Sequence, residues 1–203
     1  MSGYSVVDLE TTGLSFLKGD RILEIGLVHV DPDGTIGHTW QTLVNPERTV
    51  AATEIHGITD DAVADAPVFA DVADFFAQQL DSTVFVAHNA RFDAQFTAYQ
   101  FTACGNLSTP QLPYLDTLQL ARHYLQLPSY SLKSVTDHLG LTNQHAHSAL
   151  DDAYVTAQVL QYFMRETTAP ASLEWQSALA QARNFHGLTF DANAAEPRTV
   201  TRS

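Results

Sequence analysis

The stretch His147-Ser148-Ala149-Leu150-Asp151-Asp152-Ala153 determines how we interpret the rest of the chain. It opens a run in which apolar residues recur at helical spacing, from Ala149 to Met164. Ser148 and Asp151 have the spacing of a capping box, so the sequence predicts a helix that begins near residue 149. A histidine and an acid would then lie together at the edge of a core. An ordinary capped helix with a polar first turn explains the same residues, so the decision depends on the segments upstream.

The two adjacent acids of this stretch have different expected surroundings. On the helix, Asp152 lies beside the apolar stripe that begins at Ala149 and continues to Thr156, whereas Asp151 is rotated from it by about 100°. The sequence therefore predicts that Asp152 faces the core and that Asp151 serves the helix terminus as the capping partner of Ser148.

Length and composition favour a single domain in the cytoplasm. The chain has 203 residues, 45% of them hydrophobic, which is enough for a substantial core. No apolar run approaches the length of a membrane span, and no basic region followed by an apolar core occurs at the start of the sequence. We therefore expect a cytoplasmic protein without a membrane partner. The one cysteine, Cys104, excludes an internal disulfide and a cysteine-cluster zinc site.

The net charge limits the kinds of nucleic-acid binding that are reasonable. Twenty-three acidic residues against ten Lys and Arg give a formal charge of −13. Sequence-independent binding along a duplex needs a basic footprint, which this composition does not supply. An enzyme that neutralises phosphate locally with metal ions is not excluded, and an acidic composition also favours solubility. The charge therefore argues only against a large basic face.

Residues Tyr4–Glu10 are predicted to form a buried strand that carries two acids. Asp8 and Glu10 would point to the same side, about 7 Å apart along the strand. Two acids there repel each other and lose hydration, which is tolerable if a cation lies between them or the strand end is open to water. The following turn, Thr11-Thr12-Gly13, could present backbone N–H groups to a phosphate or sugar. A strand that ends in a polar turn is the simpler alternative.

The remaining segments predict an α/β fold with a mixed sheet of about five strands flanked by helices. Residues 21–30 and 35–44 should pair as a hairpin, and 84–87 and 112–115 should be further strands. Helices are expected to start at Asp65-Ala66-Pro67, to follow an Asn89 cap, and to span 117–125, 131–139 and 172–183. Residues 1–166 would form one domain, and 167–203 a linker, a short helix and a polar tail.

Four acids are expected at the carboxyl ends of the parallel strands, where open α/β sheets place their sites. Asp8 and Glu10 end the first strand, while Asp93 and Asp152 lie in first helical turns, where the helix dipole also favours an acid. Oxygen donors without cysteine suit Mg²⁺ or Mn²⁺ rather than zinc. A pair of such ions about 4 Å apart stabilises the attacking and leaving oxygens of an in-line phosphoryl displacement. His147 is then the candidate general base, since the unperturbed pKa of histidine, about 6.5, lies near working pH.

Three segments resemble the exonuclease motifs of the DEDD superfamily. They are Val6-Val7-Asp8-Leu9-Glu10-Thr11-Thr12-Gly13, His88-Asn89-Ala90-Arg91-Phe92-Asp93 and His147-Ser148-Ala149-Leu150-Asp151-Asp152-Ala153, in that order. The histidine five residues before the last aspartate marks the His subtype, the family of the DNA polymerase III epsilon (proofreading) subunit. The similarity covers about residues 4–165, including the loop Ile55–Asp60. Leu9 stands where many members have threonine, and residues 167–203 do not resemble the long linker and extended polymerase-binding region expected of a full proofreading subunit.

The resemblance implies a ribonuclease H-like sheet and a metal-dependent 3′→5′ exonuclease that releases nucleoside 5′-monophosphates. The substrate would be single-stranded or frayed 3′ ends, with DNA favoured, and a DNA polymerase is a candidate partner. Asp8, Glu10, Asp93 and Asp152 match the carboxylates that hold two divalent ions, Mg²⁺ or Mn²⁺, and His147 matches the general base. The positions that match the pocket for the terminal nucleotide are Thr11, Gly13, Leu14, His56, Asn89 and Phe92.

Three other hypotheses compete with this interpretation. An enzyme that trims RNA or oligoribonucleotides would differ by recognition of the 2′-hydroxyl, for which the sequence carries no signal. A non-catalytic binder of nucleic-acid ends, or a polymerase-associated module, would be expected to lose at least one of the four acids or the histidine, and all five are present. A zinc site at His145-Ala146-His147 lacks a third ligand at a recognisable spacing.

Overall fold

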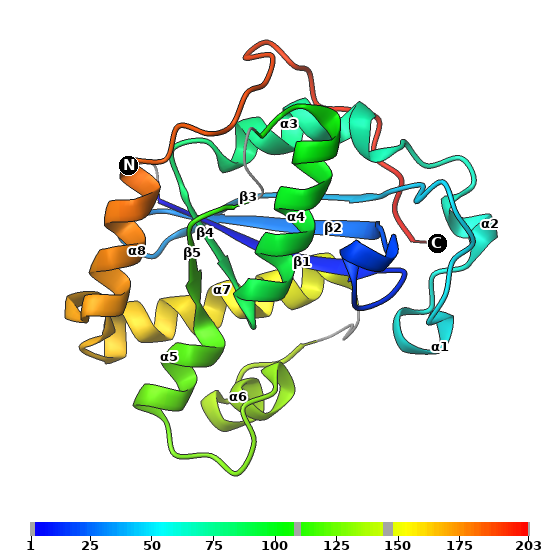
Figure 1. Ribbon diagram of the computed structural model, residues 1–203. Coiled ribbons are helices and arrows are strands. Elements are labelled where there is room, and N and C mark those ends of the chain that lie inside the picture. The colour runs from blue at the N-terminus through cyan, green and yellow to red at the C-terminus, as the bar shows by residue number, and fades with distance from the viewer. Residues whose placement is uncertain (1–2, 108–110, 144–147, 203) are drawn as a thin grey trace.

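The computed structural model describes residues 3–107, 111–143 and 148–202, in which a five-stranded mixed sheet lies between helices (Figure 1). The strands are β1 (Tyr4–Thr11), β2 (Ile22–Val30), β3 (Ile36–Leu43), β4 (Val84–Ala87) and β5 (Tyr114–Asp116), in the spatial order β3-β2-β1-β4-β5. The first three form an antiparallel meander, and β4 and β5 continue the sheet in parallel with β1. This arrangement confirms the predicted α/β fold and its mixed sheet.

The helices divide between the two faces of the sheet. One face is covered by α3 (Phe69–Leu80) and α4 (Ala90–Cys104), and the other by α5 (Thr117–Tyr124), α6 (Leu132–Leu139), α7 (Ala149–Glu166) and α8 (Leu173–Arg183). The central strand β1 supplies both cores, because its side chains alternate between faces. Val7 and Leu9 pack with α3 and α4, whereas Tyr4 and Val6 pack on the side of α7. Asp8 and Glu10 therefore belong to the α7 face.

Short elements complete the chain, and one predicted boundary is wrong. They are η1 (Phe16–Lys18), α1 (Thr53–His56), α2 (Asp60–Val63) and η2 (Ala169–Ala171). The helix expected at Asp65-Ala66-Pro67 begins only at Phe69. The carbonyl of Pro67 accepts the Asn45 N–H at 2.8 Å, so this segment pairs with the residues after β3 before it enters the helix.

Helix α7 lies unusually close to β2, and a backbone N–H in its first turn donates a hydrogen bond to a residue distant in sequence. A Cβ atom at Gly26 would lie 2.2 Å from the carbonyl carbon of Ala149, so only glycine permits this approach. Ser148 is the N-cap residue, but its side chain makes no cap hydrogen bond, so the predicted capping box is wrong. The Ala149 N–H instead donates to Oε2 of Glu24, a fully buried residue of β2, at 3.1 Å. A carboxylate is favourable at this helix end because it accepts a hydrogen bond from an otherwise unpaired N–H and interacts with the positive end of the helix dipole.

The segment after α7 returns to the sheet. Helix α8 buries Trp175, whose indole N–H donates to the hydroxyl of Tyr4 on β1 at 3.1 Å. The chain then passes over α3 to the end of the sheet near α1 and α2 (Figure 1). There the carbonyl of Val200 accepts the N–H of Leu43 at 2.6 Å. Within the described ranges, every helix is too short or too polar to cross a membrane.

Candidate active site

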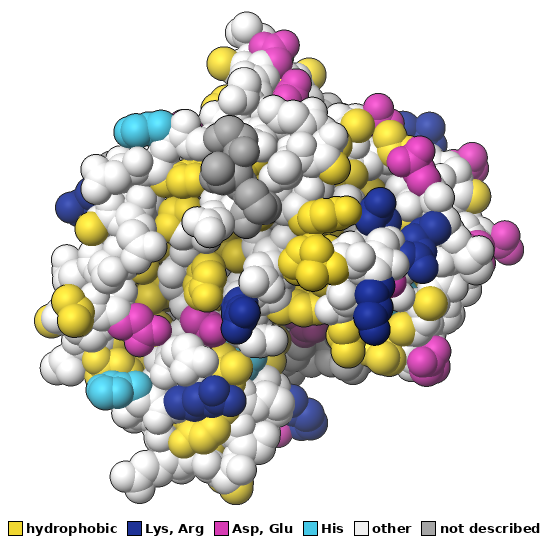
Figure 2. All heavy atoms as spheres, in the orientation of Figure 1, with side chains coloured by type: hydrophobic (Ala, Val, Ile, Leu, Met, Phe, Trp, Pro, Cys, Tyr) yellow, Lys and Arg dark blue, Asp and Glu magenta, His cyan; other side chains and the backbone are white. Residues whose placement is uncertain are grey.

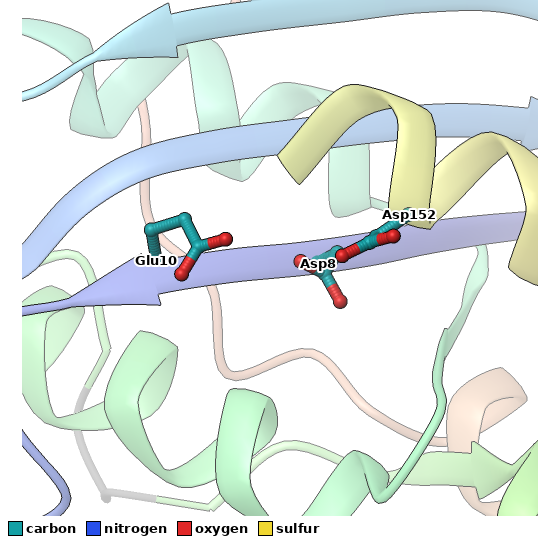
Figure 3. Close-up of side chains that lie close together, drawn as sticks. All are labelled: Asp8, Glu10 and Asp152. Atoms are coloured by element: carbon teal, nitrogen blue, oxygen red, sulfur yellow. The ribbon is translucent and has the colours of Figure 1, made fainter. Parts of the chain in front are cut away.

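Three carboxylates meet where the central strand ends. Asp8 and Glu10 project from the same side of β1, and Asp152 approaches them from the first turn of α7 (Figure 3). One oxygen from each residue lies within 4.8 Å of the other two. Asp151, the neighbour of Asp152, lines a different surface cavity together with Thr39 and Tyr154. The two adjacent acids thus face in different directions, as neighbours on a helix must.

Asp93 lies beside this cluster, in the first turn of α4, and is 5% exposed. Its charge is the largest electrostatic contribution from another residue to the raised pKa of Asp8, which places it near that carboxylate. In the described ranges, the group of acids close enough to share one ion consists of Asp8, Glu10 and Asp152, so Asp93 borders that group.

Burial and mutual repulsion make it unfavourable for Asp8, Glu10 and Asp93 to be ionised at the same time. Burial raises the pKa of Asp8 well above its usual range, and the neighbouring carboxylates raise it further. Burial raises the pKa of Glu10 to about 8, while the nearby guanidinium of Arg202 opposes that shift. Burial also raises the pKa of Asp93, although hydrogen bonds from its own and the Leu9 backbone N–H lower it. A bound cation would relieve this repulsion, and an all-carboxylate donor set fits a hard divalent ion such as Mg²⁺ or Mn²⁺.

The turn after β1 is organised by an acid that the sequence did not single out. Asp20 accepts the N–H of Ser15 at 3.0 Å and pairs with Arg48 at 3.3 Å. A Cβ atom at Gly13 would lie 2.5 Å from an oxygen of this carboxylate, so a larger residue there would have to displace the Asp20 side chain. Thr11 contributes by donating its hydroxyl to the Gly13 carbonyl at 2.7 Å. No local pattern distinguishes Asp20 from an ordinary surface acid.

Leu14 follows this turn and stands out from the surface, with 86% of its area exposed. Leu17 in η1 is 81% exposed, and Lys18 is exposed beside it. Figure 2 shows basic side chains gathered next to hydrophobic ones on the side of the molecule where Figure 1 places η1. An acidic protein thus carries a local basic and apolar surface near the turn that follows β1.

Two other candidate pocket residues have structural roles in the loops that carry them. The ring of His56 is buried, and its Nδ1 accepts the Ile58 N–H at 3.0 Å while Nε2 bonds to the Ala51 carbonyl at 3.0 Å. Asn89 is the N-cap of α4, but its side chain makes no cap hydrogen bond, contrary to prediction, and its φ is 73°. The Asn89 N–H donates to Oδ1 of Asp116 at 3.1 Å. Asp116, at the end of β5, is a further residue that sequence reasoning missed.

Phe92 packs beside the site, and the last sequence candidate, His147, falls in a part of the chain that the structure does not describe. Phe92 is half-buried, and its ring packs 4.8 Å from that of Phe96. The side-chain amide of Asn143 donates a hydrogen bond to Oδ1 of Asp152. His147 and the alternative zinc pair His145 and His147 lie outside the described residues, so the general-base role stays a prediction.

A mixed sheet with strand order β3-β2-β1-β4-β5 and acids at the end of its central strand defines an α/β enzyme of ribonuclease H-like architecture. Residues 5–160 match the exonuclease family RNase_T, and the chain belongs to this family. This result confirms that the chain belongs to an exonuclease family, as the three motifs predicted, while the His subtype stays a prediction.

Individual relatives and a solved structure agree with the family. The chain is 40% identical over 163 residues to the PolC-type DNA polymerase III of Thermotoga petrophila, an alignment that covers 79% of this chain and 12% of that protein. It is 35% identical over 164 residues to the DNA polymerase III subunit epsilon of Pasteurella multocida, covering 76% of this chain and 65% of that protein. Exonuclease X, solved with 5′ overhanging duplex DNA, superimposes with a TM-score of 0.65 at 29% identity, covering 87% of this chain and 99% of exonuclease X. The chain therefore spans only part of the length of its polymerase relatives.

Proposed function

We propose that this chain is a 3′→5′ exonuclease that removes nucleoside 5′-monophosphates from single-stranded or frayed 3′ ends of DNA. The observation that carries the proposal is the meeting of Asp8, Glu10 and Asp152 within 4.8 Å at the end of the central strand. DNA is the favoured substrate because exonuclease X binds DNA in its solved structure and two relatives are DNA polymerase III proteins. The setting would be replication or repair.

Two divalent ions, Mg²⁺ or Mn²⁺, are the proposed cofactors. Asp8, Glu10 and Asp152 would hold them, with Asp93 at the border of the group. The raised pKa values of Asp8, Glu10 and Asp93 support the assignment, because bound cations would stabilise the anionic carboxylates. When bound, such ions activate water and neutralise the charge that develops on the phosphate during the displacement.

The other residues of the chain would bind the strand end and move a proton. His147, five residues before Asp152, would take the proton from the attacking water, a role that rests on the sequence motif. Leu14 would contact the terminal base, since it is exposed in the turn that follows the strand carrying Asp8 and Glu10. Exposed Lys18 on the adjacent η1 would contact backbone phosphates. Thr11 would act on the substrate indirectly, by fixing the Gly13 carbonyl.

A DNA polymerase is the proposed partner. The PolC-type and epsilon relatives are both DNA polymerase III proteins, so the chain would edit the 3′ end that a polymerase extends. This role would place the protein in the cytoplasm. Removal of a mismatched 3′ nucleotide by the chain, measured with and without a DNA polymerase and in the absence of nucleotides, tests it: faster removal with the polymerase is expected, and an equal rate in both reactions would refute the partnership.

Digestion of end-labelled oligonucleotides tests the central proposal. Single-stranded and duplex DNA and RNA are incubated with Mg²⁺ and with a chelator. We expect shortening from the 3′ end of single-stranded DNA, 5′-monophosphate products, no reaction in chelator and resistance of a 3′-blocked strand. Hydrolysis in excess chelator, or digestion from the 5′ end, would contradict the proposal. Faster digestion of RNA than of DNA would overturn the choice of substrate.

A further inference from the structure

An arginine that is distant in sequence lies against the acid cluster. Nε and Nη2 of Arg202 donate to the two carboxylate oxygens of Glu24 at 3.1 and 2.5 Å, and Nη1 donates to the carbonyl of His56 at 2.6 Å. Nη2 also lies 3.9 Å from Oε1 of Glu10. Every nitrogen of the guanidinium is thus engaged, and one of its partners is an acid of the cluster.

Glu24 links this arginine to the helix that carries Asp152. Its side chain is completely buried on β2, where an anion without a partner cation would be strongly destabilising. Its Oε2 accepts hydrogen bonds from both Arg202 and the N–H of Ala149, the first residue of α7. One carboxylate therefore connects the arginine to the helical turn from which Asp152 projects.

The segment before Arg202 is docked independently of the arginine. The carbonyl of Val200 accepts the Leu43 N–H at 2.6 Å, and the Val200 N–H donates to Oγ1 of Thr42 at 3.3 Å. The Val200 side chain packs on the small core that includes Leu23 and Ile58. Arg202 is consequently presented to the site from a fixed backbone, and its side chain is only 28% exposed.

We propose that Arg202 is a positioning residue for the metal-binding carboxylates, an inference that rests on the proposed function. It orients Glu10 directly by charge, and it holds the first turn of α7 in place through Glu24. The planar guanidinium suits this task because it spans both oxygens of Glu24 while a third nitrogen reaches the His56 carbonyl. A lysine could supply the charge but not this set of contacts.

Loss of the guanidinium would have two opposite effects on metal binding. It would remove a positive charge that repels the incoming cation. It would also release Glu10 and leave the buried Glu24 without a cation, which loosens the turn that carries Asp152. The first effect alone would raise the affinity for the metal, and the second alone would lower it. The proposal requires the second effect to dominate.

The test compares Arg202→Met, Arg202→Lys and the control Arg198→Met, which removes the same charge from an exposed position of the same segment. Mn²⁺ binding is measured by calorimetry without substrate, together with kcat on single-stranded DNA and the melting temperature. Arg202→Met should weaken Mn²⁺ binding or lower kcat by about 10–100-fold, the usual effect of losing an outer partner of metal ligands. Arg202→Lys should recover part of the loss, and Arg198→Met should match the unaltered protein.

Each contrary outcome has a distinct meaning. Tighter Mn²⁺ binding with undiminished kcat would show that Arg202 merely repels the cation, and the proposal would fall. A lower melting temperature with unchanged Mn²⁺ binding and kcat would reduce the arginine to a structural contact, which also overturns it. Should Arg202→Met not fold, Arg202→Lys and Glu24→Gln carry the test, and normal Mn²⁺ binding in both would refute the proposal. An unaltered protein that binds Mn²⁺ but does not degrade DNA would refute the proposed function instead.

Discussion

Replacing Gly26 by alanine should displace the helix that carries Asp152. The added Cβ would lie 2.2 Å from both the carbonyl carbon and the oxygen of Ala149, and 2.4 Å from the backbone nitrogen of Leu150. Ordinary contacts begin at 3.4 Å, so the first turn of α7 must move away from β2 by about 3.4 − 2.2 = 1.2 Å. These atoms belong to the backbone, so no side-chain rotation relieves the overlap.

Such a shift should affect activity more than folding. Asp152 lies two residues beyond Leu150 and moves with the turn, and a misplacement of about 1 Å costs on the order of 10²-fold in rate. Overpacking of this kind destabilises by about 1–3 kcal/mol, which lowers the melting temperature of a domain of this size by roughly 2–12 °C. The protein should therefore fold at 25 °C and be nearly inactive.

The measurement pairs the initial rate on single-stranded DNA at saturating Mg²⁺ with a thermal melt. Gly37→Ala is the matched control, because a Cβ there meets only the His29 carbonyl oxygen at 3.7 Å and the residue lies on the adjacent strand β3. It should keep both the rate and the melting temperature. An unaltered rate for Gly26→Ala would mean that Asp152 does not need this position, and the site built on it would be wrong.

Further predictions concern individual groups of the site. Asp152→Asn should abolish turnover and weaken Mn²⁺ binding. It should not lower the melting temperature in chelator, because it removes one charge from a cluster of acids that repel each other. Asp151→Asn should keep most activity, and the reverse result would exchange the roles of the two acids. His147→Ala should lower kcat by about 10²–10⁴-fold and leave Mn²⁺ affinity nearly unchanged, so near-full activity would exclude it as the base. Because the pKa of Glu10 is raised to about 8, metal binding at pH 7 should release protons, which calorimetry in buffers of different ionisation enthalpy detects. The raised pKa also makes stability depend on pH: the stability that the neutral Glu10 carboxyl contributes is complete below its ordinary pKa of 4.5 and is lost as the pH rises through about 8. The melting temperature in chelator should therefore fall over that range. A rise would contradict the assignment.

Periodic patterns were sufficient to predict the sheet and the bounds of most helices, including the Ser131 cap of α6, whereas two other predicted helix caps were wrong. The continuous apolar run at 84–87 and the alternating hairpin near 21–44 correspond to β4, β2 and β3 within a residue or so. The cap predicted at Ser148 fails because a buried carboxylate from β2 occupies that helix end. Asn89 adopts a left-handed backbone and bonds through its N–H to Asp116 rather than through its side chain. Tertiary partners replaced the local ones in both cases.

The acids of the site were accessible to sequence reasoning because their placement follows from local geometry. Asp8 and Glu10 are two apart on a strand, and Asp152 lies on the apolar side of a helix. The groups that support them were not accessible. In the sequence, Glu24 is one polar residue in a buried strand, and Arg202 is part of a polar tail. No local pattern predicts that they pair, because they are 178 residues apart.

The pairing of Glu24 with Arg202 also sets an order in time. At a synthesis rate of about 5–20 residues per second, the 178 residues between them take roughly 10–35 s to appear. Strand β1 is made before Glu24, and strands β3 to β5 and helix α7 are made within that interval, before the cation that neutralises Glu24 is available. In the nascent chain this carboxylate must therefore stay in contact with water, because burying it as an unpaired anion is too unfavourable. We therefore expect α7 to seat fully on β2, and the acid cluster to reach its final arrangement, only after Arg202 has joined Glu24.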